Sequence, residues 1–465
     1  MIKIPTPPWR ILTVLSRAET GPLILEKEFD RKILIPNLQR VIKEYDIKYD
    51  PENPVPSDDS LAKDVWRAAV DLFLSAGVYC TTTQRRILFS EDELKEALWC
   101  YRGVLEIGEG HERRTWTPRK VEDTKLPGCL FTPVGVRASE ETFTRMIMAY
   151  IQEPLADAVS TPILDVVEGN YVKPGSPFEI QGGVVHVMLA REAALRVGRP
   201  GIAIVLTGTA LLAGAQIATS NPMWGARPTD LRLVSLISEL KVDYDLLSKA
   251  LHFRQYNGIS GALLGPLYGV YAKAEGTAII GVASHLAGLM VNQSDFTCYF
   301  PVHYKYFNNT SREMLWVVST TYQALANNTN LISGSNGFAV AGPCTDMVLY
   351  EAGLHGMVSA VSGASILWEI ASASNKHFER TTPLEARMAC ETGVAAVLSK
   401  LKRSDVNEIV KKILPKYENR IPNAPLGKTF AECYDIKTLT LSKECSELYK
   451  SIKREFEEFG IKYPF

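Results

Sequence analysis

The sequence predicts an α/β protein whose central part is a (β/α)8 TIM barrel with a helical N-terminal extension and C-terminal helices. From about residue 128, short apolar or β-branched runs alternate about eight times with longer helical patterns. Right-handed crossovers turn such an alternation into a parallel sheet, and eight units favour closure into a barrel. Before and after that region the apolar residues recur with helical spacing. We therefore expect three regions, which span residues 1–127, 128–402 and 403–465.

The N-terminal extension is expected to consist of helices. Between residues 65 and 73 the apolar side chains follow i, i+4, i+7, i+8 spacing, and Gly77 would end that helix. Ser90 and Glu93 form a capping-box pattern that opens a second helix. We expect no strand between residues 55 and 100, whereas the polar segment 103–128 is typical of a loop or a short hairpin.

The barrel region contains one strand-like run for each predicted strand–helix unit. The runs span, in order, residues 130–136, 158–163, 202–207, 231–237, 259–264, 296–303, 331–333 and 365–370. After the barrel, apolar residues between 445 and 459 line one face of a helix that Gly460 would end. We expect this last helix to pack on the outside of the barrel.

Charge and hydropathy exclude several classes of protein. The chain has 51 Lys and Arg against 52 Asp and Glu, and a nucleic-acid-binding protein usually needs a basic excess. Residues 200–226 contain no charged residue, but Gly, Gln, Asn and Pro interrupt them, so they are more typical of a buried strand, turn and helix than of a membrane span. We expect a cytoplasmic protein that binds neither nucleic acid nor membrane and forms a homo-oligomer.

Eight cysteines are scattered along the chain, and none forms a Cys-x-x-Cys pair. We expect them to be free thiols in a reducing cytoplasm. A metal site could in principle assemble from His285, His303 and His355, but isolated histidines near apolar helices are more often structural. We therefore expect no metal site, and the familiar nucleotide-binding and nucleophile signatures are absent.

In a barrel of this kind, the chemistry takes place at the C-terminal ends of the strands. Glu239 is the most notable residue there, because it is an acid just past a strand in an apolar neighbourhood. It could act as a general acid or base or as the partner of a cation; equally, it could only stabilise a helix N-terminus. The residues at the predicted strand ends are Thr207, Gly208, Glu239, Leu263, Leu264, His303, Ser335, Asn336, Phe338 and Glu369.

Six stretches of the chain resemble the monomethylamine methyltransferases, which move a methyl group from monomethylamine to the cobalt of a separate corrinoid protein. They occur in the family's order and cover most of the chain from about residue 35. The stretches are residues 77–85 (GVYCTTTQR), 198–201 (GRPG), 239–243 (ELKVD), 341–347 (AGPCTDM), 385–388 (EARM) and 427–437 (GKTFAECYDIK). The resemblance implies an eight-stranded α/β barrel, in agreement with the independent prediction above.

The resemblance also shows where this chain departs from the family. The family places pyrrolysine a few residues after the Gly-Arg-Pro-Gly motif, inside the barrel. Here that place falls on Val205, or on Leu206 if the alignment shifts by one residue. Neither side chain can form a covalent adduct with an amine.

Three further substitutions make the implied pocket more apolar. The carboxylate that matches Glu239 is kept, but Leu263 stands in place of a second carboxylate, Asn336 in place of a glutamine and Phe338 in place of a tyrosine. By this resemblance Glu239 is the candidate catalytic residue, and Val205, Leu263, Asn336 and Phe338 are candidates for binding the substrate. Phe338 and Glu239 could form part of a cage for a methylated cation.

The predicted function is therefore methyl transfer from a methylated amine, or a related donor, to Co(I) of a partner corrinoid protein, without pyrrolysine. A primary amine needs activation to leave, whereas a quaternary ammonium compound leaves as a neutral amine. No cofactor is expected to bind this chain tightly, since the partner supplies the corrinoid. The alternative is a non-catalytic homologue that binds a corrinoid protein or a small amine without turnover.

Overall fold

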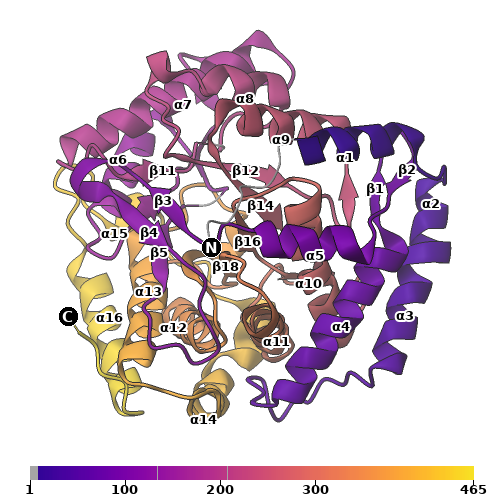
Figure 1. Cartoon of the computed structure of the whole chain (residues 1–465). Helices are drawn as coiled ribbons and strands as arrows, with labels where there is room; N and C mark the ends of the chain where they lie inside the picture. The colour runs from indigo at the N-terminus through magenta and orange to yellow at the C-terminus, as the bar shows by residue number, and fades with distance from the viewer. Residues whose placement is uncertain (1–8, 134, 207, 465) are drawn as a thin grey trace.

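Eight parallel strands form the centre of the molecule and close into a barrel (Figure 1). The computed structural model describes residues 9–133, 135–206 and 208–464. Neighbouring strands pair in the order β11-β7-β5-β19-β18-β16-β14-β12, and a parallel bridge between Val205 and Leu231 joins the two ends. The predicted (β/α)8 barrel is confirmed. Its strands are β5 (Gly128–Phe131), β7 (Ala158–Val159), β11 (Ala203–Ile204), β12 (Leu231–Ser235), β14 (Ile259–Leu264), β16 (Phe296–Tyr299), β18 (Ser333–Phe338) and β19 (Ile366–Ala371).

A helix follows each strand and packs outside the barrel. Two of these helices, α10 and α12, are buried on nearly every side, because α10 is also covered by the N-terminal region and α12 by the C-terminal helices. Helices that are apolar all round are typical of such enclosed positions. The helices are α6 (Glu140–Ile151), α7 (Pro177–Arg196), α8 (Ala213–Thr219), α9 (Tyr244–Tyr256), α10 (Ala274–Met290), α11 (Arg312–Asn328), α12 (Asp346–Val361) and α13 (Pro383–Leu398).

The N-terminal extension covers one side of the barrel, where Figure 1 shows it in indigo and violet. Ser90 and Glu93 form the expected capping box, and Gly77 ends α4 with a φ of 70°. Helix α4 packs against α10 and α11, so its apolar face completes the barrel's outer layer. The extension contains α1 (Trp9–Thr20), α2 (Glu26–Glu28), the π-helical turn η1 (Phe29–Leu34), α3 (Ile35–Glu44), α4 (Asp59–Ala76) and α5 (Glu91–Cys100).

The expectation of no strand between residues 55 and 100 was wrong. β1 (Val78–Cys80) and β2 (Arg85–Ile87) form a hairpin, and β1 also pairs in parallel with β13 (Lys241–Val242) from the barrel region. Three-residue strands are too short to show an alternating pattern, and the second partner of β1 is far away in the sequence. The segment 103–128 contains the short hairpin of β3 (Leu105–Ile107) and β4 (Arg114–Trp116).

The C-terminal helices pack on the opposite part of the wall, with α16 against α12 and α13. Gly460 follows α16 with a φ of 85°, as its position in the sequence predicts. The helices are α14 (Arg403–Ile413), α15 (Phe430–Cys433) and α16 (Lys443–Glu457). In the described part of the chain, no helix is long and apolar enough to cross a membrane.

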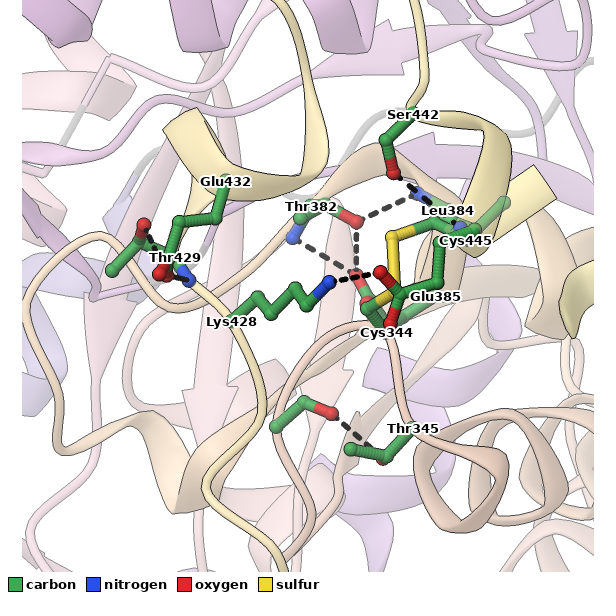
Figure 2. The surroundings of a disulfide bond; sticks show 12 residues. Cys344, Thr345, Thr382, Leu384, Glu385, Lys428, Thr429, Glu432, Ser442 and Cys445 are labelled. Carbon is green, nitrogen blue, oxygen red and sulfur yellow. Dashed lines mark hydrogen bonds and ion pairs between the residues drawn. A yellow bond between two sulfur atoms is a disulfide. The ribbon is translucent and has the colours of Figure 1, made fainter.

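A disulfide bond joins Cys344, in the loop between β18 and α12, to Cys445, in the first turn of α16 (Figure 2). The expectation that all eight cysteines are free thiols was therefore wrong for two of them. The two residues are separated by 101 positions, so spacing alone gave no sign of the pairing. The other six cysteines are buried thiols.

The contact between α12 and α13 leaves no room for a side chain at Gly356. A Cβ built there would overlap the backbone carbonyl of Ala389, which lies on α13. We expect Gly356→Ala to destabilise the protein by about 1–3 kcal/mol or more, because the backbones must move apart. The measurement is the thermal unfolding midpoint followed by circular dichroism.

Gly214→Ala is the matched control, because Gly214 is an exposed helical glycine with no atom near the added Cβ. There the helix propensity of alanine should be neutral or stabilising by up to about 1 kcal/mol. Equal midpoints for the two variants would contradict the packing argument.

Candidate active site at the barrel mouth

A cavity of about 210 Å³ lies among the C-terminal ends of the barrel strands. Its size suits a small ligand, since cavities for larger ligands usually measure about 300–1,000 Å³. Strands β12, β14, β18 and β19 and the segments after β7 and β11 all contribute to its wall. The described lining residues are Gly135, Ser160, Thr161, Ile163, Val205, Gly208, Leu211, Gln216, Leu233, Ser235, Lys249, Leu263, Asn336 and Trp368.

Three of the five site residues predicted from the sequence line this one cavity. They are Val205, Leu263 and Asn336, from three different strand ends. Glu239 and Phe338 also follow or end strands at this face of the barrel, but they are not among the described lining residues. Thr207 lies outside the described residues, as does the side chain of Glu369.

Three buried polar atoms of the lining have no hydrogen-bond partner among the described residues. They are Oδ1 of Asn336, Oε1 of Gln216 and Nε1 of Trp368. The amide nitrogen of Gln216 donates to the carbonyl of Ala210 at 2.9 Å, and that of Asn336 contacts Sγ of Cys298 at 3.7 Å. Because buried polar groups are normally paired, two unpartnered acceptor oxygens and one unpartnered N–H donor on residues that line one small cavity indicate a polar ligand.

Lys249 is the only charged side chain among the described lining residues. Its Nζ forms an ion pair with Asp245 at 2.9 Å and donates to the carbonyl of Leu211 at 2.7 Å. The positive charge of Lys249 is therefore balanced by Asp245 within the cavity wall. The described lining supplies no carboxylate, imidazole or thiol that could act as a general acid or base.

A neutral histidine supports one side of the cavity from behind. The Nε2 atom of His186 lies 2.8 Å from Oγ1 of Thr161, and its Nδ1 lies 2.7 Å from Oγ1 of Thr209. Complete burial lowers the pKa of His186 to about 3. The ring thus fixes the two hydroxyl groups and carries no charge at neutral pH.

Glu239 lies in the connection between β12 and β13, and only 1% of it is exposed. Its Oε1 accepts a hydrogen bond of 2.7 Å from the backbone N–H of Leu267, the first residue of the short strand β15 (Leu267–Tyr268) in the connection after β14. Burial raises the pKa of Glu239 to about 8, although the hydrogen bond and the charge of Lys241 lower it. The carboxyl group is therefore largely protonated at neutral pH and holds two mouth loops together.

Phe338 belongs to an aromatic cluster beside the cavity. Its ring centroid lies 5.5 Å from that of Phe300 and 5.6 Å from that of Phe307. Val302 and Leu267 pack against the same group. These contacts show that the Phe338 side chain packs in a hydrophobic cluster and account for its burial.

The three histidines considered for a metal site do not form a group of ligands in the described structure. His285 bonds the carbonyl of Gly281 at 2.7 Å, His355 lies near Ser335, and His303 accepts from the backbone N–H of Lys305. Within the described residues, the one cluster of three or more metal-ligating side chains consists of Cys344, Cys433 and Cys445.

Sequence reasoning missed several residues of the cavity. Leu233, Lys249 and Gln216 line it, and His186 supports it, yet none matches a motif. The sequence offered one indication of Gln216. It lies in the uncharged segment 200–226, which is expected to be buried, and a polar side chain in such a segment is a candidate for a functional role. Trp368 matches no motif either.

A larger cavity of about 410 Å³ lies at the opposite end of the barrel. It is lined by Ile259, where β14 begins, and by Asp295, just before β16. Since reactions in parallel α/β barrels take place at the C-terminal ends of the strands, the smaller cavity is the candidate active site.

The closed parallel barrel and the small cavity at its C-terminal mouth define an α/β-barrel protein of the kind that binds a small ligand among its βα loops. A family model described as monomethylamine methyltransferase MtmB matches residues 9–461. The chain therefore belongs to the monomethylamine methyltransferase MtmB family.

The relatives match this chain over nearly its whole length. Monomethylamine methyltransferase MtmB of Methanosarcina mazei and MtmB1 of Methanosarcina acetivorans are each 30% identical to it over 447 residues, which is 96% of this chain and 97% of theirs. The crystal structure of MtmB from Methanosarcina barkeri superposes with a TM-score of 0.94 at 28% identity, covering 97% of this chain and 98% of that one. A crystal structure of the hydroxylamine MtmB complex matches equally well.

The raised pKa of Glu239 predicts a specific pH dependence of stability. The folded protein keeps the proton up to about pH 8, whereas the unfolded chain loses it near 4.5. Between these values the folded state holds more protons, so this group makes stability fall as pH rises, by at most ~1.4 kcal/mol per pH unit. Glu239→Gln removes the titration, and its stability relative to the wild type should increase from pH 5 to pH 8.

The measurement is the free energy of unfolding in urea at several pH values. Glu141→Gln serves as the control, because Glu141 is exposed on α6 and faces solvent in both states. A difference between Glu239→Gln and the wild type that stays constant with pH would show that the Glu239 carboxyl does not titrate in this way.

Proposed function

We propose that this protein transfers a methyl group from a methylated amine, or a related donor, to Co(I) of a partner corrinoid protein, and that it does so without pyrrolysine. Family membership supports methyl transfer. The observation that carries the finer proposal is the composition of the cavity: Val205, one of the two residues to which the resemblance assigns the adduct position, lines it, and the described lining contains no carboxylate, imidazole or thiol.

This cavity suits a donor whose leaving group departs without a proton. When a quaternary ammonium compound loses a methyl group, the electron pair of the broken C–N bond stays on nitrogen, and a neutral tertiary amine leaves. The methyl group forms its new bond with the electron pair of Co(I). No proton is transferred, so no acid is required, whereas monomethylamine would have to leave as an unstable amide ion or be protonated first.

The described side chains can bind and orient such a donor. The unpartnered oxygens of Asn336 and Gln216 can face the positive charge, and the indole ring of Trp368 offers a surface for a methylated cation. Val205 and Leu263 fill the apolar part of the wall and keep water away. We propose that Glu239 acts as a positioning residue through its bond to the loop after β14.

The alternative, a non-catalytic homologue that binds a corrinoid protein or a small amine, has one observation in its favour. The same lack of an acid or base in the described lining would also follow if the cavity had lost its chemistry. Under either function the corrinoid belongs to the partner protein, and we propose a cytoplasmic homo-oligomer.

The first functional prediction concerns the choice of methyl donor. The purified chain, a Co(I) corrinoid protein and a series from monomethylamine to tetramethylammonium are mixed, and methyl-Co(III) formation is followed by absorbance. We expect the quaternary compound to react at least ~100-fold faster than monomethylamine, because lost activation costs several kcal/mol of barrier. Fastest transfer from monomethylamine would falsify the proposal. Binding of the corrinoid protein without transfer from any donor would establish the alternative.

The second functional prediction concerns Asn336. Asn336→Leu keeps the volume but removes the unpartnered oxygen, so its carbonyl dipole no longer stabilises the charge, and we expect KM for a cationic donor to rise roughly 10–100-fold. The control is Ser333→Ala, which lies at the other end of the same strand and outside the described lining. If both variants change KM equally, Asn336 does not contact the donor.

A further inference from the structure

Three cysteine sulfurs meet where the C-terminal segment joins the barrel wall. Cys344 precedes α12, Cys433 is the last residue of α15, and Cys445 lies in the first turn of α16. Their Sγ atoms all lie within 4.8 Å of one another. Two of them form the disulfide, and the third is a buried thiol. None of the three is among the described residues that line the candidate active site.

An acidic side chain beside the sulfurs has an unused oxygen. Glu385, at the start of α13, is fully buried. Its Oε2 accepts bonds from the backbone N–H and Oγ1 of Thr382, at 2.9 and 2.7 Å, whereas its Oε1 has no partner among the described residues. Figure 2 shows Glu385 next to the disulfide. Its oxygens are nevertheless not among the ligand atoms that lie within 4.8 Å of one another in this cluster.

The surrounding backbone favours negative charge on the sulfurs. Helix α12 begins at Asp346, two residues after Cys344, and Cys445 is the third residue of α16. Cys344 and Cys445 therefore both lie at helix N-terminal ends, and such ends stabilise thiolates. Lys428, which Figure 2 labels, is already paired with Glu444.

Two chemistries fit three neighbouring cysteines, and the geometry favours one of them. A thiol–disulfide relay has to exchange electrons with a partner thiol outside the protein, but Cys433 and Cys445 are only 1% and 0% exposed. Metal binding needs no such partner, and a bound cation itself deprotonates its thiol ligands. Three sulfurs within 4.8 Å of one another match the spacing of a metal ligand set, and a shift of the Glu385 side chain would bring its free oxygen to the fourth position.

We propose that Cys344, Cys433 and Cys445, in their reduced form, bind one Zn²⁺ ion, with Glu385 as the fourth ligand. Tetrahedral Zn²⁺ with Zn–S bonds of about 2.3 Å requires sulfurs about 3.8 Å apart, and the three sulfurs already lie within 4.8 Å. The disulfide is then the oxidised, metal-free state of the same site. A thiol or phosphine reductant supplies two electrons, two protons complete the thiols, and binding of Zn²⁺ releases the thiol protons.

The disulfide and the metal would both connect the loop before α12 to α16, so the site has a structural role. The disulfide ties the loop before α12 to α16, and the metal would add α15 and α13 to this connection. The C-terminal segment would therefore stay attached to the barrel in reducing as well as oxidising surroundings.

The test uses the full chain, reduced with a phosphine under anaerobic conditions and exposed to Zn²⁺ or to Co²⁺ as a spectroscopic probe. We expect about one bound metal per chain and thiolate-to-cobalt charge-transfer absorption. Cys433→Ser retains the disulfide pair but should lose the metal, as should the oxidised wild type. Cys100→Ser, a buried cysteine outside the cluster, should bind like the wild type, and Glu385→Gln should weaken binding at least about tenfold.

Absence of bound metal in the reduced wild type, or equal binding by Cys433→Ser, would overturn the proposal. Unchanged affinity in Glu385→Gln would remove Glu385 from the ligand set. A second measurement needs no variant: Zn²⁺ should protect all three cysteines together from alkylation in the reduced wild type, as read by peptide mass spectrometry. Equal alkylation with and without Zn²⁺ would overturn the proposal even if a variant fails to fold.

Discussion

The barrel closes between β11 and β12, and the rest of the structure depends on this closure. Val205 bridges to Leu231, its N–H bonds the carbonyl of Val159, and the N–H of Leu206 bonds the carbonyl of Leu231. The residue that seals the sheet therefore also presents its side chain to the cavity. A small β-branched residue suits both roles, because it favours the extended backbone and leaves the interior open.

The N-terminal extension anchors the connection that follows β12. β1 pairs with β13, and Lys241, whose side chain is only 3% exposed, forms ion pairs with Glu26 at 2.9 Å and Asp30 at 3.0 Å. Glu239 lies two residues before Lys241 and bonds the neighbouring loop. The extension and the Glu239 carboxyl group thus both hold the connection that follows β12, whose last residue, Ser235, lines the cavity.

The sequence predicted the barrel well, because eight buried strands followed by helices leave a strong pattern of apolar runs. It did not predict β1 and β2, whose few residues show no alternation, or the disulfide, whose partners are distant. At the site, a strand end predicts which face a residue lies on, so Val205, Leu263 and Asn336 were found together. It does not predict the direction of the side chain, and for that reason Phe338 and Glu239 point into neighbouring layers instead of the cavity.

The pairing of β1 with β13 has a consequence for the order in which a growing chain can assemble. The N-terminal region leaves the ribosome first, but its small sheet and the ion pairs of Lys241 require a segment from the middle of the barrel. β5 likewise finds its second neighbour, β19, only near the end of synthesis. The earliest-made residues therefore stay incompletely packed until the middle of the barrel has been made, and β5 lacks its second neighbour until β19 has left the ribosome.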